Sequence, residues 1–380
     1  MLTGGTGYLG SLIVTTLLSQ LKTTRIVALV RKNYTLENFI EPIRVEFASE
    51  GKTLTKADIE RIDLIKLPEF EQLEALAPQL KALGVDEIIH CAGCLDYFNS
   101  IELERVNVIY TQFLLKLAVR LSVKRFIYLS TAYNCGYING PAAEVLHDEP
   151  DAEPTDYTRT KRIAELNIAN SGIPFLIIRP SIVIGHSQTG RYSGKRYGFY
   201  QHLMGLEKLL CNKYHPEYHV VAPKNPLNLV HQDVFQSVFY EAYNKLSDNT
   251  IMHLISLEKT CPTVRDIWNM WLNDVAHPQV VYYYSRLDEV PLTRIHSRQR
   301  AYLMFASKNL EIAAHHWKFE THILDQLRLQ GLNITDATLE TVAICQQRFI
   351  RSSERIQKFL AENHRHMPQE YETIDMTSGI

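Results

Sequence analysis

The sequence has no run of roughly 18 apolar residues, the length that a membrane-spanning helix requires. Its first residues lack the basic and then apolar segments of a signal peptide. Positive and negative charges almost cancel, leaving a formal net charge of −2, so no global basic field points to nucleic acid. These absences argue against a membrane-spanning, secreted or nucleic-acid-binding protein.

Cysteine is also sparse. Six cysteines spread over 380 residues do not form a disulfide framework and fit the reducing cytoplasm, where we expect the protein. The histidines, among them His315, His316, His364 and His366, lack the spacing of zinc ligands, so we expect no metal site.

What the sequence does contain is an alternation of short apolar runs and amphipathic stretches in its first half. Continuously apolar strands separated by helices predict a parallel sheet with helices on both faces, which is a doubly wound, Rossmann-type α/β fold. The expected strands are 25–30, 61–67, 86–91, 125–130 and 175–184, and the expected helices are 8–21, 70–83 and 103–121. In the second half, helices are expected at 201–210, 232–245 and 339–363, and strands at 217–223 and 250–256.

A glycine-rich loop stands at the start of the chain. Gly4, Gly7 and Gly10 form a G-x-x-G-x-x-G pattern that leads directly into an amphipathic helix. The first glycine permits a tight turn, the second a close approach of backbone to a diphosphate, and the third close packing of the helix on the sheet. The helix N-terminus supplies N–H donors and the positive end of a dipole. We therefore expect a dinucleotide site contacted by Thr3, Gly4, Gly7, Tyr8, Leu9 and Gly10.

The strand expected before this loop has almost no room. Only Met1, Leu2 and Thr3 precede it, whereas an average strand has about five or six residues. A central strand so short would leave backbone groups of its neighbours unpaired. We therefore expect the natural chain to begin upstream of Met1.

The end of the second expected strand indicates which dinucleotide is preferred. An NAD site usually has Asp or Glu there to bind the ribose 2′-hydroxyl, but this chain has Arg31 and Lys32. A planar guanidinium can instead pair with the 2′-phosphate of NADP(H). We expect NADP(H) rather than NAD(H).

A tyrosine and a lysine share one face of a predicted helix. Tyr157 and Lys161 are one helical turn apart, and Ser130 and Thr131 stand earlier, at the carboxyl end of an expected strand where such sheets bind ligands. A phenol is normally too weak an acid, and a neighbouring ammonium, helped by an oxidised nicotinamide, would lower its pKa towards the working pH. We expect Thr131, Tyr157 and Lys161 to be catalytic, with Thr131 holding the substrate oxygen and Lys161 also binding the nicotinamide ribose.

Several segments resemble the extended short-chain dehydrogenases/reductases, over most of residues 2–260. These segments are "TGGTGYLG", "IIHCAG", "ERVNVIYT", "LSTAYNCG", "YTRTKRIAE", "IIRPSIVIG" and "LNLVHQDV". The resemblance implies a structural role for Asn107, the catalytic position for Thr131, and a place beside the nicotinamide for Arg179 and Pro180. It adds Cys91, Ala92, Gly93, Asn107, Arg179 and Pro180 to the expected cofactor-binding residues.

Two segments point to one branch of that superfamily. "RPSIVIGHSQTG" and "ALVR" are similar to the thioester reductases and fatty acyl-CoA reductases of the male-sterility group. This similarity implies hydride transfer from NADPH to an acyl thioester, either a fatty acyl-CoA or a carrier-bound acyl group. Tyr157 and Thr131 would stabilise the oxyanion, a thiol would leave, and the product would be an aldehyde or, after a second round, an alcohol.

A basic loop follows the predicted sheet. Arg191, Lys195 and Arg196 either contact phosphates of coenzyme A or of a carrier protein's phosphopantetheine arm, or form an ordinary solvated loop. An acyl carrier protein is therefore a candidate partner. Three other functions of the same superfamily stay open: epimerisation or dehydration of nucleotide sugars, hydroxysteroid-type dehydrogenation, and non-catalytic dinucleotide binding.

The alternation of strands and helices changes near residue 185, which suggests a division into four regions. Residues 1–185 are expected to form the NADP-binding domain, and 186–295 a substrate-binding region interleaved with the sheet. Residues 296–365 are expected to be mainly helical, and 366–380 a flexible tail.

Overall fold

The computed structural model describes residues 1–194, 197–363 and 367–376. The chain divides into two compact units. Unit 1 consists of Met1–Ser181, Val234–Leu254 and Phe319–Ile334, and unit 2 consists of Ile182–Asp233, Ile255–Lys318 and Thr335–Ile380. The four regions proposed from the sequence stay a prediction.

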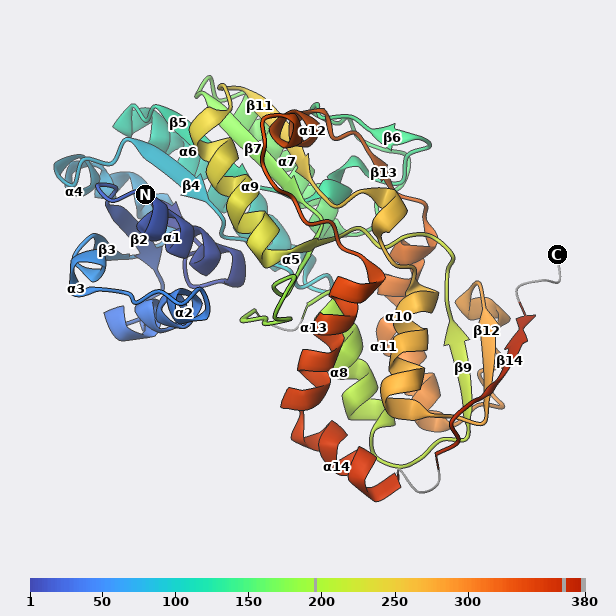
Figure 1. Ribbon diagram of the computed structural model, residues 1–380. Coiled ribbons are helices and arrows are strands. Elements are labelled where there is room, and N and C mark those ends of the chain that lie inside the picture. Colours follow the sequence, from blue (N-terminus) through green and yellow to red (C-terminus); the bar gives the residue numbers. More distant parts are fainter. Residues whose placement is uncertain (195–196, 364–366, 377–380) are drawn as a thin grey trace. The chain divides into compact units, whose positions relative to one another are not determined.

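Unit 1 is built on a seven-stranded parallel sheet in the order β3-β2-β1-β4-β5-β7-β11. Helices, among them α1, α6, α7 and α9, flank this sheet (Figure 1), which confirms the predicted Rossmann-type fold. The sheet strands are β1 (Leu2–Thr3), β2 (Ile26–Val30), β3 (Ile62–Lys66), β4 (Glu87–His90), β5 (Arg125–Leu129), β7 (Phe175–Pro180) and β11 (Thr250–Leu254).

The order of the strands fixes where a ligand can bind. The short β1 pairs with β2 on one side and with β4 on the other, so the loops after β1 and β4 leave the same edge of the sheet in opposite directions. The crevice at such a switch point is the usual ligand site of an open parallel sheet.

Several helical segments of unit 1 begin after a residue whose side chain caps the helix. α7, for example, starts after a Thr155 cap whose hydroxyl accepts a hydrogen bond from the Thr158 N–H. The segments are α1 (Tyr8–Gln20), α2 (Leu36–Ser49), α3 (Lys56–Ile59), η1 (Phe70–Leu76), α4 (Ala77–Ala82), α5 (Ser100–Leu103), η2 (Glu104–Ile109), α6 (Tyr110–Leu121), η3 (Ala132–Cys135), α7 (Asp156–Ala169), α9 (Gln232–Lys245) and α12 (His322–Leu329). The short β6 (Pro141–Ala142) pairs with β13 (Lys318–Phe319).

Unit 2 has its own core, in which Trp268 and Trp271 are almost completely buried. Its three-stranded sheet has the order β14-β12-β9, and β10 pairs with β8. The segments are β8 (Ile182–Ile184), α8 (Phe199–Leu210), β9 (Glu217–Val221), β10 (Leu229–His231), η4 (Glu258–Thr260), α10 (Val264–Trp271), η5 (Leu272–Ala276), β12 (Val280–Tyr284), η6 (Leu287–Glu289), α11 (Ser297–Ala314), α13 (Leu339–Ser352), α14 (Glu354–Asn363) and β14 (Glu372–Asp375).

Three segment predictions need correction. The strand expected over 175–184 is two strands, because after Pro180 the chain leaves β11 and Ile182 donates its N–H to Asn228. The helix expected over 339–363 breaks at Ser353, whose backbone is extended and whose hydroxyl caps α14. Within the tail expected to be flexible, Glu372–Asp375 pairs in parallel with β12.

The helix expected over 70–83 is also divided, into η1 and α4. Pro78 stands in the first turn of α4, where its missing N–H costs nothing, but it disfavours a continuous α-helix through the residues before it. The helix expected over 103–121 is longer than predicted, since α5, the π-helical η2 and α6 follow one another from Ser100 to Leu121.

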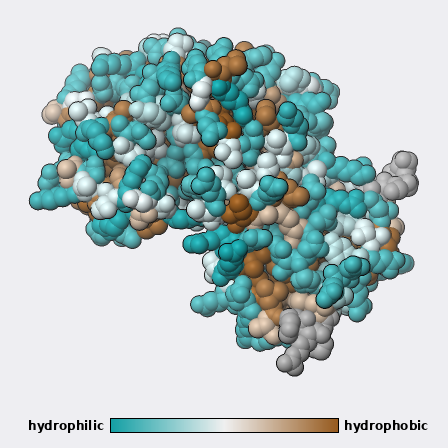
Figure 2. Space-filling view, in the orientation of Figure 1, coloured by the Kyte–Doolittle hydropathy of each residue, from teal (hydrophilic) through white to brown (hydrophobic). Residues whose placement is uncertain are grey.

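Among the described residues, no helix is both long and apolar enough to cross a membrane. The face seen in Figure 2 is largely hydrophilic, with hydrophobic residues in small groups.

Replacing Phe126 tests the packing of the central sheet. This ring on β5 is fully buried and meets His90 edge-on at 6.0 Å. Phe126→Ala should destabilise unit 1 by about 3–5 kcal/mol, because it removes buried contacts and leaves a cavity. Val119→Ala on the exposed side of α6 is the control and should change stability by less than about 0.5 kcal/mol. Thermal and denaturant unfolding measure the change in stability of both variants, and equal losses of stability would contradict the described core.

Candidate functional site

The glycine loop between β1 and α1 is packed so closely that side chains do not fit. Gly7 donates its N–H to the Gly4 carbonyl at 2.9 Å, and Gly4 has a positive φ of 73°. A Cβ on Gly4 would lie 2.5 Å from the Ala92 nitrogen, and one on Gly10 would lie 2.1 Å from the Gly4 oxygen. The loop therefore depends on glycine at both positions, as a diphosphate-binding turn does.

The N-terminus of α1 opens directly from this loop. Gly7 is the N-cap and provides no side chain, and the first turn, which contains Tyr8 and Leu9, has no acidic residue. The first N–H groups of a helix point out of its end, and they carry the positive end of the dipole. This end of α1 therefore fits the diphosphate of a dinucleotide.

Thr3 ties the ends of β1 and β4 together. Its hydroxyl contacts His90 Nδ1 at 2.6 Å and accepts a hydrogen bond from the Ala92 N–H at 3.3 Å. His90 Nε2 lies 2.9 Å from the Thr111 hydroxyl on α6. Burial and the nearby Lys161 hold the pKa of His90 well below its usual value, so this imidazole is neutral and serves as a hydrogen-bonding link.

Asn107 connects the segment after β4 with α7. Its amide oxygen accepts the Cys94 N–H at 2.8 Å, and its amide nitrogen donates to the Cys94 carbonyl at 3.2 Å and to the Thr160 hydroxyl at 3.0 Å. Thr160 in turn donates to the Tyr157 carbonyl. A Cβ on Gly93 would lie 3.3 Å from the Asn107 amide oxygen, so there is little spare room beside this link.

Lys161 is buried at the end of β5. Its ammonium donates to the Leu129 carbonyl at 2.5 Å and lies 4.0 Å from the centre of the Tyr128 ring. Burial lowers the pKa of Lys161 to about 8, although Cys91 and Glu165 act in the opposite direction. The group can therefore change its charge near neutral pH.

Tyr157 is half-buried one turn before Lys161, and its ring lies 5.8 Å from that of Tyr97. Burial, together with Tyr97 and Cys91, raises the pKa of Tyr157. This direction is that of the chain alone, in which burial dominates; the lowering expected from the sequence needs an oxidised nicotinamide beside the phenol and stays a prediction. The phenol is therefore protonated, which suits a proton donor.

Thr131 stands two residues after the end of β5 and caps η3, accepting the Tyr133 N–H at 3.4 Å. η3 packs against α7, so Thr131 and the Tyr157–Lys161 turn belong to neighbouring elements. Ser130 and Asn134 flank it, and their buried side-chain polar atoms have no hydrogen-bond partner within the described chain. Such atoms are usually satisfied by water or by a ligand.

Arg31 and Lys32 are exposed immediately after β2, and the Arg31 guanidinium makes no ion pair with any described residue.

Arg179 on β7, in contrast, is completely buried. Its guanidinium binds Glu165 of α7 through two hydrogen bonds, of 3.0 and 2.6 Å, and also donates to the carbonyls of Ala143 and Val145. Arg179 thus holds β7 against α7, while Pro180, the last residue of β7, pairs with Leu254 of β11. A direct contact of either residue with a cofactor stays a prediction.

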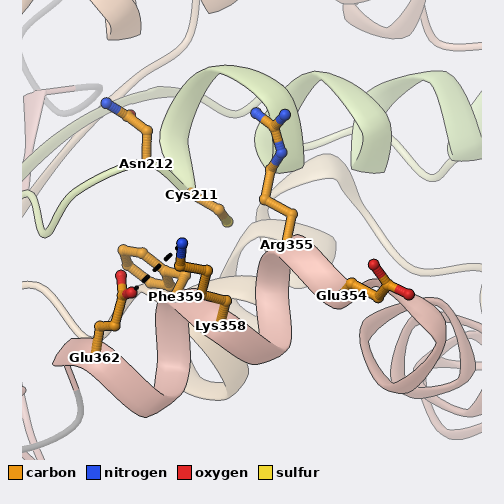
Figure 3. Close-up of a pocket in the computed structure, with 7 residues that line it drawn as sticks. All are labelled: Cys211, Asn212, Glu354, Arg355, Lys358, Phe359 and Glu362. Atoms are coloured by element: carbon orange, nitrogen blue, oxygen red, sulfur yellow. Dashed lines mark ion pairs between the residues drawn. The ribbon is translucent and has the colours of Figure 1, made fainter.

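The predicted catalytic and cofactor-binding residues all lie in unit 1, whereas Arg191, proposed for phosphate contact, lies in unit 2. A hollow of about 440 Å³ in unit 2 is lined by none of them and contains the ion pair between Lys358 and Glu362, at 3.8 Å (Figure 3). Lys195 and Arg196, proposed for phosphate contact, and His364 and His366 lie outside the described residues.

Three residues beside the site were not singled out from the sequence: Tyr97, Tyr128 and Glu165. Glu165 could have been identified from the sequence, since it stands one helical turn after Lys161 and therefore on the same face of the helix. Tyr97 and Tyr128 could not have been identified, because nothing in the sequence around them distinguishes them from aromatic residues of the core.

The glycine loop at the switch point and the Tyr–Lys turn on α7 define an NAD(P)-dependent oxidoreductase of the extended short-chain dehydrogenase/reductase type, in agreement with the comparisons below. A family model described as male sterility protein matches residues 2–235, and the chain belongs to this family.

One curated relative is FrzA, a non-canonical nonribosomal peptide synthetase from Cladobotryum sp, which is 25% identical over 220 residues. The match covers 50% of the chain and 20% of the synthetase, so the chain spans much less than the length of that relative.

Two solved structures have the same fold at low sequence identity. The terminal R domain from the myxalamid PKS-NRPS pathway has a TM-score of 0.70 and 20% identity, covering 98% of this chain and 92% of that one. A thiolation-reductase di-domain from an archaeal nonribosomal peptide synthetase has a TM-score of 0.64 and 18% identity, covering 96% and 90%.

Substitution of Gly10 tests the expected dinucleotide-binding site. Gly10→Ala should weaken dinucleotide binding at least tenfold, because its Cβ would collide with the Gly4 carbonyl and move the loop. Gly172→Ala is the control: its φ of +73° costs about 1 kcal/mol, but nothing lies within 4 Å of the new methyl and binding should not change. Fluorescence titration gives both dissociation constants, and wild-type affinity in Gly10→Ala would contradict the assignment.

Proposed function

We propose that the chain is an NADPH-dependent reductase of acyl thioesters. The observation that carries this proposal is the Tyr157–Lys161 turn, fixed through Thr160 and Asn107 to the segment that packs against the glycine loop. The family membership and the fold shared with terminal reductase domains support the thioester as substrate.

Each predicted catalytic residue has a role that its surroundings support. The protonated phenol of Tyr157 donates a hydrogen bond and then its proton to the carbonyl oxygen of the thioester. Thr131 holds the same oxygen, and the charged form of Lys161 stabilises the resulting phenolate. When bound, the nicotinamide supplies the hydride to the carbonyl carbon.

The atoms balance as a two-electron reduction. The carbonyl carbon gains a hydride and its oxygen gains the proton from Tyr157, which gives a hemithioacetal. When the C–S bond then breaks, the hydroxyl proton passes to the sulfur, a thiol leaves and an aldehyde remains. A second hydride and proton would convert the aldehyde to an alcohol. We expect the acyl group to arrive on coenzyme A or on a carrier protein, as the fold shared with a thiolation-reductase di-domain suggests.

Tyr157→Phe tests the proposed proton donor. The variant should reduce acyl thioesters about 10²–10⁴-fold more slowly, because it lacks the proton, while its NADPH affinity should be unchanged. Tyr240→Phe, at a half-buried position on α9, is the matched control and should keep wild-type activity. The measurement is NADPH oxidation with coenzyme A and N-acetylcysteamine thioesters, with products identified by mass spectrometry.

Equal rates in Tyr157→Phe and the wild type would remove Tyr157 as the acid. Nucleotide sugars are tested in parallel: turnover of these, without thioester reduction, would favour the epimerase or dehydratase alternative. Binding of NADPH with no turnover of either class would favour a dinucleotide-binding protein.

Arg31→Ala tests the preference for NADPH. Loss of the guanidinium should weaken NADPH binding roughly 10- to 100-fold and leave NADH binding unchanged, because only NADPH carries the 2′-phosphate. Arg25→Ala, just before the opposite end of β2, is the control; it pairs with Asp63 and should affect neither dinucleotide. Calorimetry measures the six dissociation constants of the wild type and the two variants, and an equal effect on NADH would contradict the assignment.

A further inference from the structure

The segment after β4 exposes large apolar side chains. Phe98 is 89% exposed, Ile101 is 81% exposed and Leu95 is 38% exposed. Single exposed apolar residues are normal on a protein surface, whereas several gathered together mark a binding surface. These three residues lie within the short stretch 95–101, so they need a common explanation.

Tyr97 joins this stretch to the predicted catalytic tyrosine. Its ring centre lies 5.8 Å from that of Tyr157, at an angle of 35°. Consecutive Cα atoms are only about 3.8 Å apart, so the backbones of Leu95 and Phe98 lie within one or two residues of this contact. The exposed apolar side chains therefore lie next to the contact between the Tyr97 and Tyr157 rings.

Local hydrogen bonds fix the conformation of the stretch. The Asp96 carboxylate accepts the Phe98 N–H at 3.1 Å, and the Asp96 carbonyl accepts the Asn99 N–H at 3.1 Å. The Asn99 side chain then caps α5 by accepting the Glu102 N–H at 3.1 Å. Because this turn is already ordered, a ligand that binds to it loses little free energy in ordering the chain.

We propose that Leu95, Tyr97, Phe98 and Ile101 form the binding surface for the apolar acyl chain of the substrate. This inference rests on the proposed function, in which Tyr157 holds the carbonyl oxygen of the thioester. The acyl chain is bonded to that same carbonyl carbon, so its first methylenes come close to Tyr97 and its later ones reach Phe98 and Ile101. Burial of methylenes against these side chains would favour apolar acyl groups over polar ones.

The test compares wild type with Phe98→Ser/Ile101→Ser on N-acetylcysteamine thioesters from acetyl to octanoyl. The wild-type kcat/KM should rise with chain length, by up to about fourfold per methylene. In the double variant the rise should stop after the first methylenes, which Tyr97 contacts, with the octanoyl value falling at least tenfold and the acetyl value unchanged. Both residues are exposed, so folding is preserved, and Leu329→Ser, at an equally exposed leucine of α12, should keep the wild-type slope.

A second measurement does not need turnover. Non-reactive S-alkyl thioethers of N-acetylcysteamine are titrated by calorimetry. Their affinity should rise with alkyl length up to octyl in the wild type, whereas in the double variant it should stop rising after the first methylenes. This result without any thioester reduction would leave the surface in place and contradict only the proposed function.

The same chain-length dependence in wild type and double variant would overturn the inference, as would no dependence in the wild type. If the double variant sedimented differently but kept the wild-type dependence of kcat/KM on chain length, the surface would be a contact between protein copies. That result would also overturn the inference.

Discussion

The arrangement of the site depends on the buried amide of Asn107. Its three hydrogen bonds hold the backbone of Cys94 on one side and the hydroxyl of Thr160 on the other. Thr160 lies between Tyr157 and Lys161, while the segment just before Cys94 packs against Gly4. One side chain thus fixes the distance between the dinucleotide turn and the Tyr–Lys turn. Asn107 belongs to the π-helical η2, and a π-turn within a longer helix often marks a functional site.

Much of unit 1 could be predicted from the sequence, because strands that are continuously apolar and helices with one apolar face leave clear periodic patterns. The strands expected at 61–67 and 125–130 are present as β3 and β5, and the glycine pattern does open a helix. Element breaks were harder to predict. Ser353, whose hydroxyl donates to the Glu207 carboxylate, divides one apolar pattern into α13 and α14. After Pro180 the chain changes its strand partner, and Ile182 donates its N–H to Asn228. Both breaks depend on residues distant in the sequence.

The direction of side chains could not be predicted. Spacing alone places Lys161 one turn after Tyr157, but only the folded chain shows that its ammonium lies over the Tyr128 ring and donates to the Leu129 carbonyl. Likewise, only the folded chain shows that the Arg179 guanidinium binds Glu165 and backbone carbonyls, while its expected contact with a cofactor stays a prediction. Burial raises the pKa of Tyr157 in the chain alone, and the lowering expected beside an oxidised nicotinamide stays a prediction.

These observations lead to one account, in which a dinucleotide lies across the switch point of the sheet and ends beside Tyr157 and Lys161. A crystal structure of the chain with NADP⁺ tests it most directly. The account predicts the diphosphate at the N-terminus of α1, the 2′-phosphate beside Arg31, and the nicotinamide ribose within hydrogen-bonding distance of Lys161. A dinucleotide bound elsewhere, or with its nicotinamide turned away from Tyr157, would contradict it.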